Sequence, residues 1–190
     1  HTRCLRVSWA REMCIRDRKQ EVLFLLLNDY ADWEGAFLSI SLNAGVLPGN
    51  EVKYISKTVA PTLDEVRSIG GFRTVPDYSF QTMPADYAAL VLIGGMQWQS
   101  PESELVVPIV QDALQRGKIV GAICNASAFM GAHGFLNNVK HTSNTLPYLK
   151  QFAGSAYTNE AGYQEKQAVS DQNIVCLLYT SPSPRDPKTS

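Results

Sequence analysis

Cysteine is scarce in the central part of this 190-residue chain, and its placement excludes several kinds of site. Of the four cysteines, Cys4 and Cys14 lie near the start and Cys176 lies near the end. Cys124 is the one cysteine of the central region, which excludes a disulfide framework there and a Cys-x-x-Cys metal or redox pair. Any thiol chemistry of the central region therefore falls to Cys124.

Other signatures are missing as well. The chain has no phosphate-loop and no Gly-x-Gly-x-x-Gly motif, and its histidines lack the spacing of zinc ligands, so we expect no nucleotide cofactor and no metal. The longest apolar run, at residues 22–27, is too short to cross a bilayer. Residues 20–175 hold nine Lys and Arg against fifteen Asp and Glu, which gives no footprint for nucleic acid. These absences predict a soluble, cytoplasmic protein.

The two ends differ from the middle in composition. Residues 1–19 are rich in arginine without apolar periodicity, and residues 176–190 contain the run Ser181-Pro182-Ser183-Pro184. Both ends resemble translated sequencing-adapter segments, and we leave them out of the fold as one leaves out tags. We expect one domain at residues 20–175, with non-native or disordered flanks at 1–19 and 176–190.

Three segments, at residues 22–27, 89–93 and 119–123, are continuously apolar. Such runs predict parallel strands that are buried on both faces. Residues 52–56 are a weaker fourth candidate for a strand. We also expect a small hairpin within residues 70–78 and a last hairpin within residues 167–175.

Amphipathic helices are predicted between these strands. Trp33, Ala36, Phe37 and Ile40 form an i, i+3, i+4, i+7 stripe that we expect to face the core. A second helix is predicted from Ser100-Pro101-Glu102 up to a stop at Gly117. Strands that alternate with helices predict an α/β domain with helices on both faces of a parallel sheet.

Cys124 directly follows the predicted strand at 119–123, and a helix is predicted to begin just after it. A thiol at such a strand–turn–helix elbow has the position of a nucleophile. The unpaired amides and the dipole of a helix start favour a thiolate, so the position predicts a lowered thiol pKa. The alternative is that Cys124 is a small buried apolar residue without chemistry.

Two further groups lie where parallel strands end, which is where ligands collect in such sheets. Gly94 and Gly95 follow the strand at 89–93, and their amides with that of Asn125 are candidates for an oxyanion hole. Glu34 lies beside the apolar stripe of the first helix, where burial would keep its carboxyl protonated and able to donate to a thiolate. The alternatives are a tight turn for the glycines and a solvated side chain for Glu34.

Taken together, Glu34, Gly94-Gly95 and Gly121-Ala122-Ile123-Cys124 resemble the PfpI-type family of the class I glutamine amidotransferase-like superfamily, which includes the parkinsonism-associated deglycase. The resemblance implies a flavodoxin-like sandwich, usually a homodimer. The resemblance also implies that Cys124 is a reactive thiol, that Glu34 is the acid hydrogen-bonded to it and that Gly95 is an oxyanion donor. It also implies that a closing strand and helix after Val175 are missing.

The chain departs from the protease-like members of that family, which place a histidine directly after the cysteine, where this chain has Asn125. The departure argues against a Cys–His dyad of adjacent residues. Of the other histidines, His141 is near the position where relatives keep a pocket histidine and is the better candidate base, whereas His133 is expected to be structural.

The resemblance favours a cysteine-dependent enzyme of the hydrolase, lyase, deglycase or amidotransferase type that acts on a small carbonyl or amide compound. One rival is a non-catalytic redox sensor or stress-response protein in which Cys124 is oxidised. Another is a degenerate domain that only makes partner contacts and whose Cys124 is inert. Turnover separates the enzyme from both rivals.

Overall fold

The fold is built on a seven-stranded sheet with the strand order β5–β2–β1–β6–β7–β9–β8. The structure, a computed structural model, describes residues 19–45 and 51–178. The strands are β1 Gln20–Leu25, β2 Tyr54–Ala60, β5 Tyr78–Ser79, β6 Ala89–Leu92, β7 Ile119–Ile123, β8 Ala168–Asp171 and β9 Ile174–Leu177. Neighbouring strands are parallel except for the antiparallel β8–β9 hairpin.

The three strands predicted from continuous apolar runs form the centre of this sheet. β1, β6 and β7 are adjacent, with Leu25 opposite Leu92 and Leu92 opposite Ala122. Their side chains are buried on both faces, as Leu23 (0% exposed) and Phe24 (5%) illustrate. Because these strands are parallel and in register, their carboxyl ends open onto one edge of the sheet.

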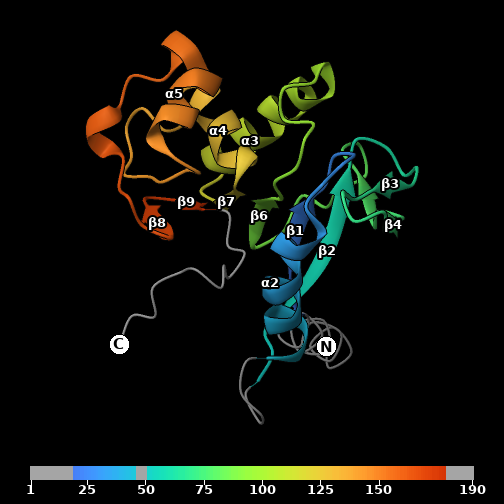
Figure 1. Ribbon diagram of the computed structural model, residues 1–190. Helices are drawn as coiled ribbons and strands as arrows, with labels where there is room; N and C mark the ends of the chain where they lie inside the picture. Colours follow the sequence, from blue (N-terminus) through green and yellow to red (C-terminus); the bar gives the residue numbers. More distant parts are fainter. Residues whose placement is uncertain (1–18, 46–50, 179–190) are drawn as a thin grey trace, which may run out of the picture.

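Helices cover both faces, as predicted (Figure 1). Helices α3 (Val107–Gln115), α4 (Asn125–Ala132) and α5 (Leu146–Ala153) lie on one face, and α2 (Asp32–Ala44) lies on the other. Short 3-10 turns occur at Pro101–Val106, Gly154–Ala156 and Glu160–Gly162. The larger core lies under α3, α4 and α5, and a smaller one that includes Phe24, Val91 and Ile123 lies on the face of α2.

Helix α2 has its predicted place but not its predicted orientation. Phe37 and Ile40 of the expected core-facing stripe are 74% and 61% exposed. The helix instead approaches the sheet through Gly35, where an added Cβ would lie 3.3 Å from the side chains of Phe24 and Ile93. Phe37 lies about 200° around the helix from Gly35, so close packing at the glycine turns Phe37 outward. The prediction that this stripe faces the core is wrong.

Two short segments also differ from expectation. The strand β4 (Arg73–Thr74) pairs with β3 (Val66–Arg67) in a separate antiparallel ribbon. Tyr78, expected at the end of a hairpin or excursion within residues 70–78, instead joins β2 together with Ser79 as the edge strand β5. The side chain of Asp77 accepts hydrogen bonds from the backbone and hydroxyl of Thr58, which holds the segment before β5 against β2.

The predicted last hairpin is β8–β9, and β9 continues to Leu177, two residues past the expected domain end. Cys176 is 0% exposed, because β9 pairs with β7 and places this side chain in the larger core. The expectations for residues 1–18 and 179–190 lie outside the described residues. Within the described ranges, no helix combines the length and the apolar content that a bilayer crossing requires.

Candidate active site

The three groups predicted to form a site meet at the carboxyl edge of the central strands. Glu34 comes from the first turn of α2, Gly94 follows β6 and Cys124 follows β7. The N–H of Gly94 donates to Oε2 of Glu34 at 2.8 Å. A Cβ added to Gly94 would overlap the Glu34 carboxylate and lie 2.8 Å from the Cβ of Cys124. Glycine at this position therefore lets the carboxylate and the cysteine approach each other.

Cys124 occupies the predicted elbow between β7 and α4. Its φ of 55° and ψ of −122° are sparsely populated for a residue with a Cβ, at a cost of about 1–3 kcal/mol. Its N–H donates to the carbonyl of Leu177 on β9 at 3.1 Å, and its carbonyl accepts from the N–H and the hydroxyl of Ser127 at 3.0 and 2.6 Å. These hydrogen bonds hold the strained turn and leave the thiol partly exposed.

Three polar groups contact the sulfur of Cys124. The side-chain amide of Asn144 donates to Sγ at 3.4 Å. The backbone N–H of Asn125 and the carboxyl of Glu34 also interact with the sulfur and act on the pKa of the thiol. The two amide donors favour a thiolate, whereas a charged Glu34 favours the protonated thiol.

Glu34 is 8% exposed, and its environment favours the protonated carboxyl. Burial raises its pKa from 4.5 to about 7, against the hydrogen bonds from Gly94 and Cys124, which lower it. Its other oxygen, Oε1, is buried and has no hydrogen-bond partner among the described residues. The prediction that Glu34 is a solvated helix residue is thereby excluded, and its partial protonation near neutral pH follows from its burial.

The thiol pKa differs from its prediction. Burial first, and then the charge of Glu34, raise the pKa of Cys124 to about 11, while the donors on Asn144 and Asn125 lower it. A helix start was expected to lower this pKa. The expectation is wrong because the thiol sits in a half-buried position beside a carboxylate, and these two effects outweigh the amide donors.

Cys124 and Glu34 are best described as a pair that shares protons. Below pH 7 both groups are protonated, and between about 7 and about 11 the pair holds one proton. Within that range the adjacent carboxylate is in a position to accept the thiol proton.

Gly95 directs its amide toward this pair. The preceding carbonyl, of Gly94, accepts from the N–H of Ala31 at 2.8 Å, on the β1 side of β6. In a trans peptide the N–H points opposite to the C=O, so the N–H of Gly95 points toward the β7 side, where Cys124 lies. A Cβ on Gly95 would lie 2.5 Å from the carbonyl of Asp29, which requires glycine at this close approach.

The side chain of Asn125 joins these elements and does not act as a base. Its Nδ2 donates to the carbonyl of Gly95 at 2.8 Å. Its Oδ1 accepts from the hydroxyl of Tyr148 at 2.8 Å and from Nδ2 of Asn144 at 3.2 Å. The amide thus braces the loop after β6 against α5. Asn144 and Tyr148 were not predicted, because their segment carries no strand periodicity or motif of its own.

His141 does not reach the Cys124 site. Its side chain is 0% exposed, its Nδ1 bonds the carbonyl of Val139 and its Nε2 bonds the hydroxyl of Tyr157, both at 2.8 Å. Burial lowers its pKa and so favours the neutral ring. With both ring nitrogens bound inside the core, His141 has a structural position, and the prediction that it is the base is corrected. His133 contacts the ring of Phe129, away from the sulfur's partners.

In the part of the chain that the structure describes, no three His, Cys, Asp or Glu side chains gather as metal ligands. The polar atoms that converge on Cys124 are a carboxyl, two side-chain amides, a phenol and backbone amides. Such groups bind and polarise a carbonyl oxygen and move a proton.

Comparisons with known proteins agree with this geometry. The chain matches the DJ-1/PfpI family over residues 20–189. It is 38% identical over 164 residues to the "uncharacterized protease YdeA" of Bacillus subtilis. The matched stretch covers 86% of this chain and 78% of that protein. A second B. subtilis protein, named "uncharacterized protease YoaZ", is 30% identical over 165 residues, with the same coverage of 86% and 78%.

Two solved structures share the fold. A ThiJ/PfpI family protein from Bacillus anthracis has a TM-score of 0.76 at 30% identity, over 85% of this chain and 76% of that one. A DJ-1 superfamily protein from Agrobacterium tumefaciens has a TM-score of 0.73 at 31% identity, over 84% of this chain and 81% of that one. The resemblance stated from sequence is confirmed, and the chain belongs to the DJ-1/PfpI family.

Proposed function

We propose that this protein is a thiol enzyme that acts on a small carbonyl or amide compound. Cys124 is the nucleophile, and Glu34 is the group that moves protons. The observation that carries this proposal is the close approach of Cys124 to the buried carboxyl of Glu34 across Gly94, where an added Cβ would overlap the carboxylate and lie 2.8 Å from the Cβ of Cys124. Burial raises the pKa of that carboxyl to about 7. A proton acceptor with a pKa near the working pH is the most effective general base.

The reaction begins with proton transfer within the pair. Above pH about 7 the ionised Glu34 accepts the thiol proton as Sγ bonds to the carbonyl carbon. The π electrons of the C=O bond move to oxygen, and the N–H of Gly95 stabilises the oxyanion. With a dicarbonyl, Glu34 then protonates this oxygen and a hemithioacetal results. Transfer of its C–H proton to the neighbouring carbonyl carbon, with the hydroxyl proton passing to that carbonyl's oxygen, gives a thioester, which water hydrolyses to a hydroxy acid and the free thiol.

With an amide, the C–N bond breaks instead, and Glu34 gives its proton to the leaving nitrogen. The thioester on Cys124 is then hydrolysed by water, which regenerates the thiol. The names of the B. subtilis relatives, both called proteases, support hydrolysis as one reaction type. The amide of Asn125 is not a base, and both ring nitrogens of His141 are hydrogen-bonded within the core. Glu34 is therefore the side chain beside the sulfur that can transfer a proton.

The test is turnover by the full chain. Wild type, Cys124→Ser and Cys176→Ser are each given a simple dicarbonyl and an activated amide, and product is measured by chromatography. We expect turnover by wild type and by Cys176→Ser, and none by Cys124→Ser. Equal turnover by Cys124→Ser assigns the activity to another site. No turnover by any of them supports the redox-sensing alternative.

A further inference from the structure

We infer that the Cys124 site selects uncharged carbonyl or amide compounds and rejects those that carry a carboxylate or phosphate next to the reacting carbon. This inference rests on the proposed function and names its substrate class. It comes from the set of polar groups around the sulfur, which offers one carboxyl and several neutral donors but no cation.

The neutral groups are fixed by one another. Nδ2 of Asn144 contacts both Sγ of Cys124 and Oδ1 of Asn125, at 3.4 and 3.2 Å. The hydroxyl of Tyr148 donates to that same Oδ1 at 2.8 Å. Burial and the neighbouring sulfur raise the pKa of Tyr148, which keeps its phenol neutral. None of these groups offsets the charge of an anionic substrate.

The charged group that acts on the sulfur is the carboxylate of Glu34. Several cations of the described residues pair with carboxylates that are not partners of the sulfur. Lys118 and Arg116, at the amino end of β7, pair with Asp86 and Asp112 at 3.2 and 3.1 Å. On α5, which supplies Tyr148, Lys150 pairs with Glu160 at 2.5 Å.

The histidines do not supply the charge either. His141 is fully buried in the core, and Nε2 of His133 lies 3.6 Å from a carboxylate oxygen of Glu104. Arg67 on β3 is exposed, and its carbonyl accepts from the N–H of Asp29 at 2.7 Å on the loop side of the site. Its side chain is the cation that an anionic substrate would have to recruit, so it enters the test.

An anionic substrate would therefore bring a second negative charge beside Glu34 in a half-buried site. Like charges a few ångströms apart repel strongly where water is partly excluded, and no paired cation offsets the loss of hydration. A neutral carbonyl compound meets neither penalty. The site thus discriminates through repulsion as well as through binding.

Iodoacetamide and iodoacetate test this discrimination, since they differ in charge but hardly in size. With either reagent the Sγ–C bond forms, the C–I bond breaks, iodide leaves and the thiol proton passes to Glu34. Both reagents meet the same thiol, so the ratio of their rate constants cancels its intrinsic reactivity. The rates are read at the tryptic peptide 119–140, which contains Cys124 and no other cysteine, and 2-mercaptoethanol supplies the reference ratio.

At pH 8 we expect the iodoacetamide-to-iodoacetate ratio at Cys124 to exceed the reference ratio by at least about tenfold. Glu34→Gln, which removes the charge but keeps the shape, lowers the ratio severalfold. Asn144→Lys, which places a cation at the sulfur, lowers it below the value of the uncharged variant Asn144→Met. Arg67→Ala leaves the ratio unchanged.

A reactive Cys124 with the reference ratio in wild type overturns the inference and leaves the proposed thiol chemistry standing. A ratio that rises in Arg67→Ala overturns it as well, since Arg67 would then be admitting the anion. A folded protein in which neither reagent modifies Cys124 overturns the proposed function, and the inference falls with it.

Discussion

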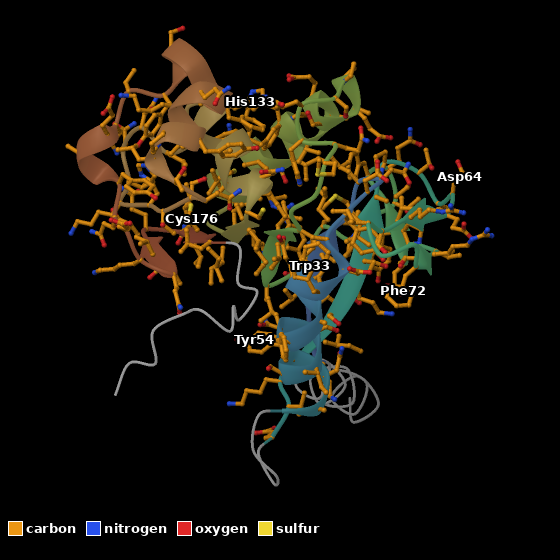
Figure 2. All side chains as sticks on the ribbon, viewed as in Figure 1. Trp33, Tyr54, Asp64, Phe72, His133 and Cys176 are labelled. Atoms are coloured by element: carbon orange, nitrogen blue, oxygen red, sulfur yellow. The ribbon has the colours of Figure 1, made fainter. Side chains whose placement is uncertain are left out.

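Cys176 lies in β9 and Cys124 directly follows the neighbouring strand β7, and burial raises the pKa of both thiols, to about 12 and about 11. Their surroundings differ. Cys176 lies within β9 (Figure 2), opposite Ala122, with its side chain fully enclosed in the larger core. Cys124, two residues past Ala122, has left the strand and meets a carboxylate and two amide donors.

The comparison teaches that a thiol's pKa does not by itself identify a nucleophile in this protein. Both values place the thiol in its protonated form at neutral pH. What separates the two residues is access and a base in contact. The strained backbone of Cys124 takes its thiol out of the strand, and Glu34 places beside the sulfur the carboxyl proposed as the base.

The largest effect is expected for alkylation of the two thiols in the folded protein. Cys176 is reached after unfolding, which for a domain stable by 5 kcal/mol or more means a rate at least about 10³-fold below that of Cys124. Iodoacetamide labelling read by mass spectrometry at both peptides measures this. In urea the two rates should converge, which controls for peptide effects. Comparable rates in the native protein would remove the distinction drawn above.

Next in size is the loss of the base. Glu34→Gln keeps the hydrogen bond to Gly94 possible in shape but cannot accept a proton, so we expect the proposed turnover at pH 8 to fall about 10²-fold. Iodoacetamide labelling of Cys124 should not fall, because the variant also removes the charge that raises the thiol pKa. In wild type the turnover rate should rise with pH through about 7, as Glu34 ionises, and this step should be absent in the variant.

Glu21→Gln is the matched control for that experiment. Glu21 lies in β1 near the opposite end of the sheet, where its carboxylate accepts from the hydroxyl of Tyr78. Its replacement should leave both the rate and the pH step unchanged. A pH step that persists in Glu34→Gln would assign it to a different group.

The same carboxyl has a cost in stability that Cys176 does not share. The unfolded chain releases the Glu34 proton near pH 4.5 and the folded chain near 7, so the folded state holds the extra proton between these values. The free energy of unfolding therefore decreases as pH rises through this window, by about 3 kcal/mol in total. Urea denaturation should show Glu34→Gln gaining this amount on wild type between pH 4 and pH 8. A constant difference would mean that Glu34 titrates normally.

The smallest effect concerns the amide donor. Asn144→Leu removes the hydrogen bond to Sγ, which stabilises the thiolate by about 1 kcal/mol, so labelling at pH 8 should fall about fivefold. Asn138→Leu, at an exposed position between α4 and α5, is the matched control and should not change the rate. A rate unchanged in Asn144→Leu would show that the carboxylate alone activates Cys124.

Much of this arrangement was predictable because it depends on strand ends. Continuous apolar runs located β1, β6 and β7, and residues that directly follow parallel strands must meet at one edge. Glu34, Gly94 and Cys124 were therefore brought together correctly. The elbow was predictable for the same reason, since a buried strand that passes at once into a helix needs a sharp turn at Cys124.

The remainder depends on packing that no local pattern records. The orientation of α2 is decided by the close approach at Gly35, which turned the apolar stripe of Phe37 and Ile40 outward. His141 was the better candidate base by position, but tertiary contacts with Val139 and Tyr157 enclose it. The thiol pKa was mispredicted because burial and Glu34 act across the fold, whereas the helix start is a local feature.

The hydrogen bond from the N–H of Cys124 to the carbonyl of Leu177 links the proposed nucleophile to β9, the last strand in the sequence. That strand is held between β7 and the edge strand β8. Edge hairpins open locally at a lower free energy than the centre of a sheet, and whatever they hold is released with them. The amide proton of Cys124 should therefore exchange with solvent deuterium in step with the β8–β9 hairpin rather than with the central strands. The lifetime of the reactive geometry is then set at the sheet's edge, by how long β9 stays in place.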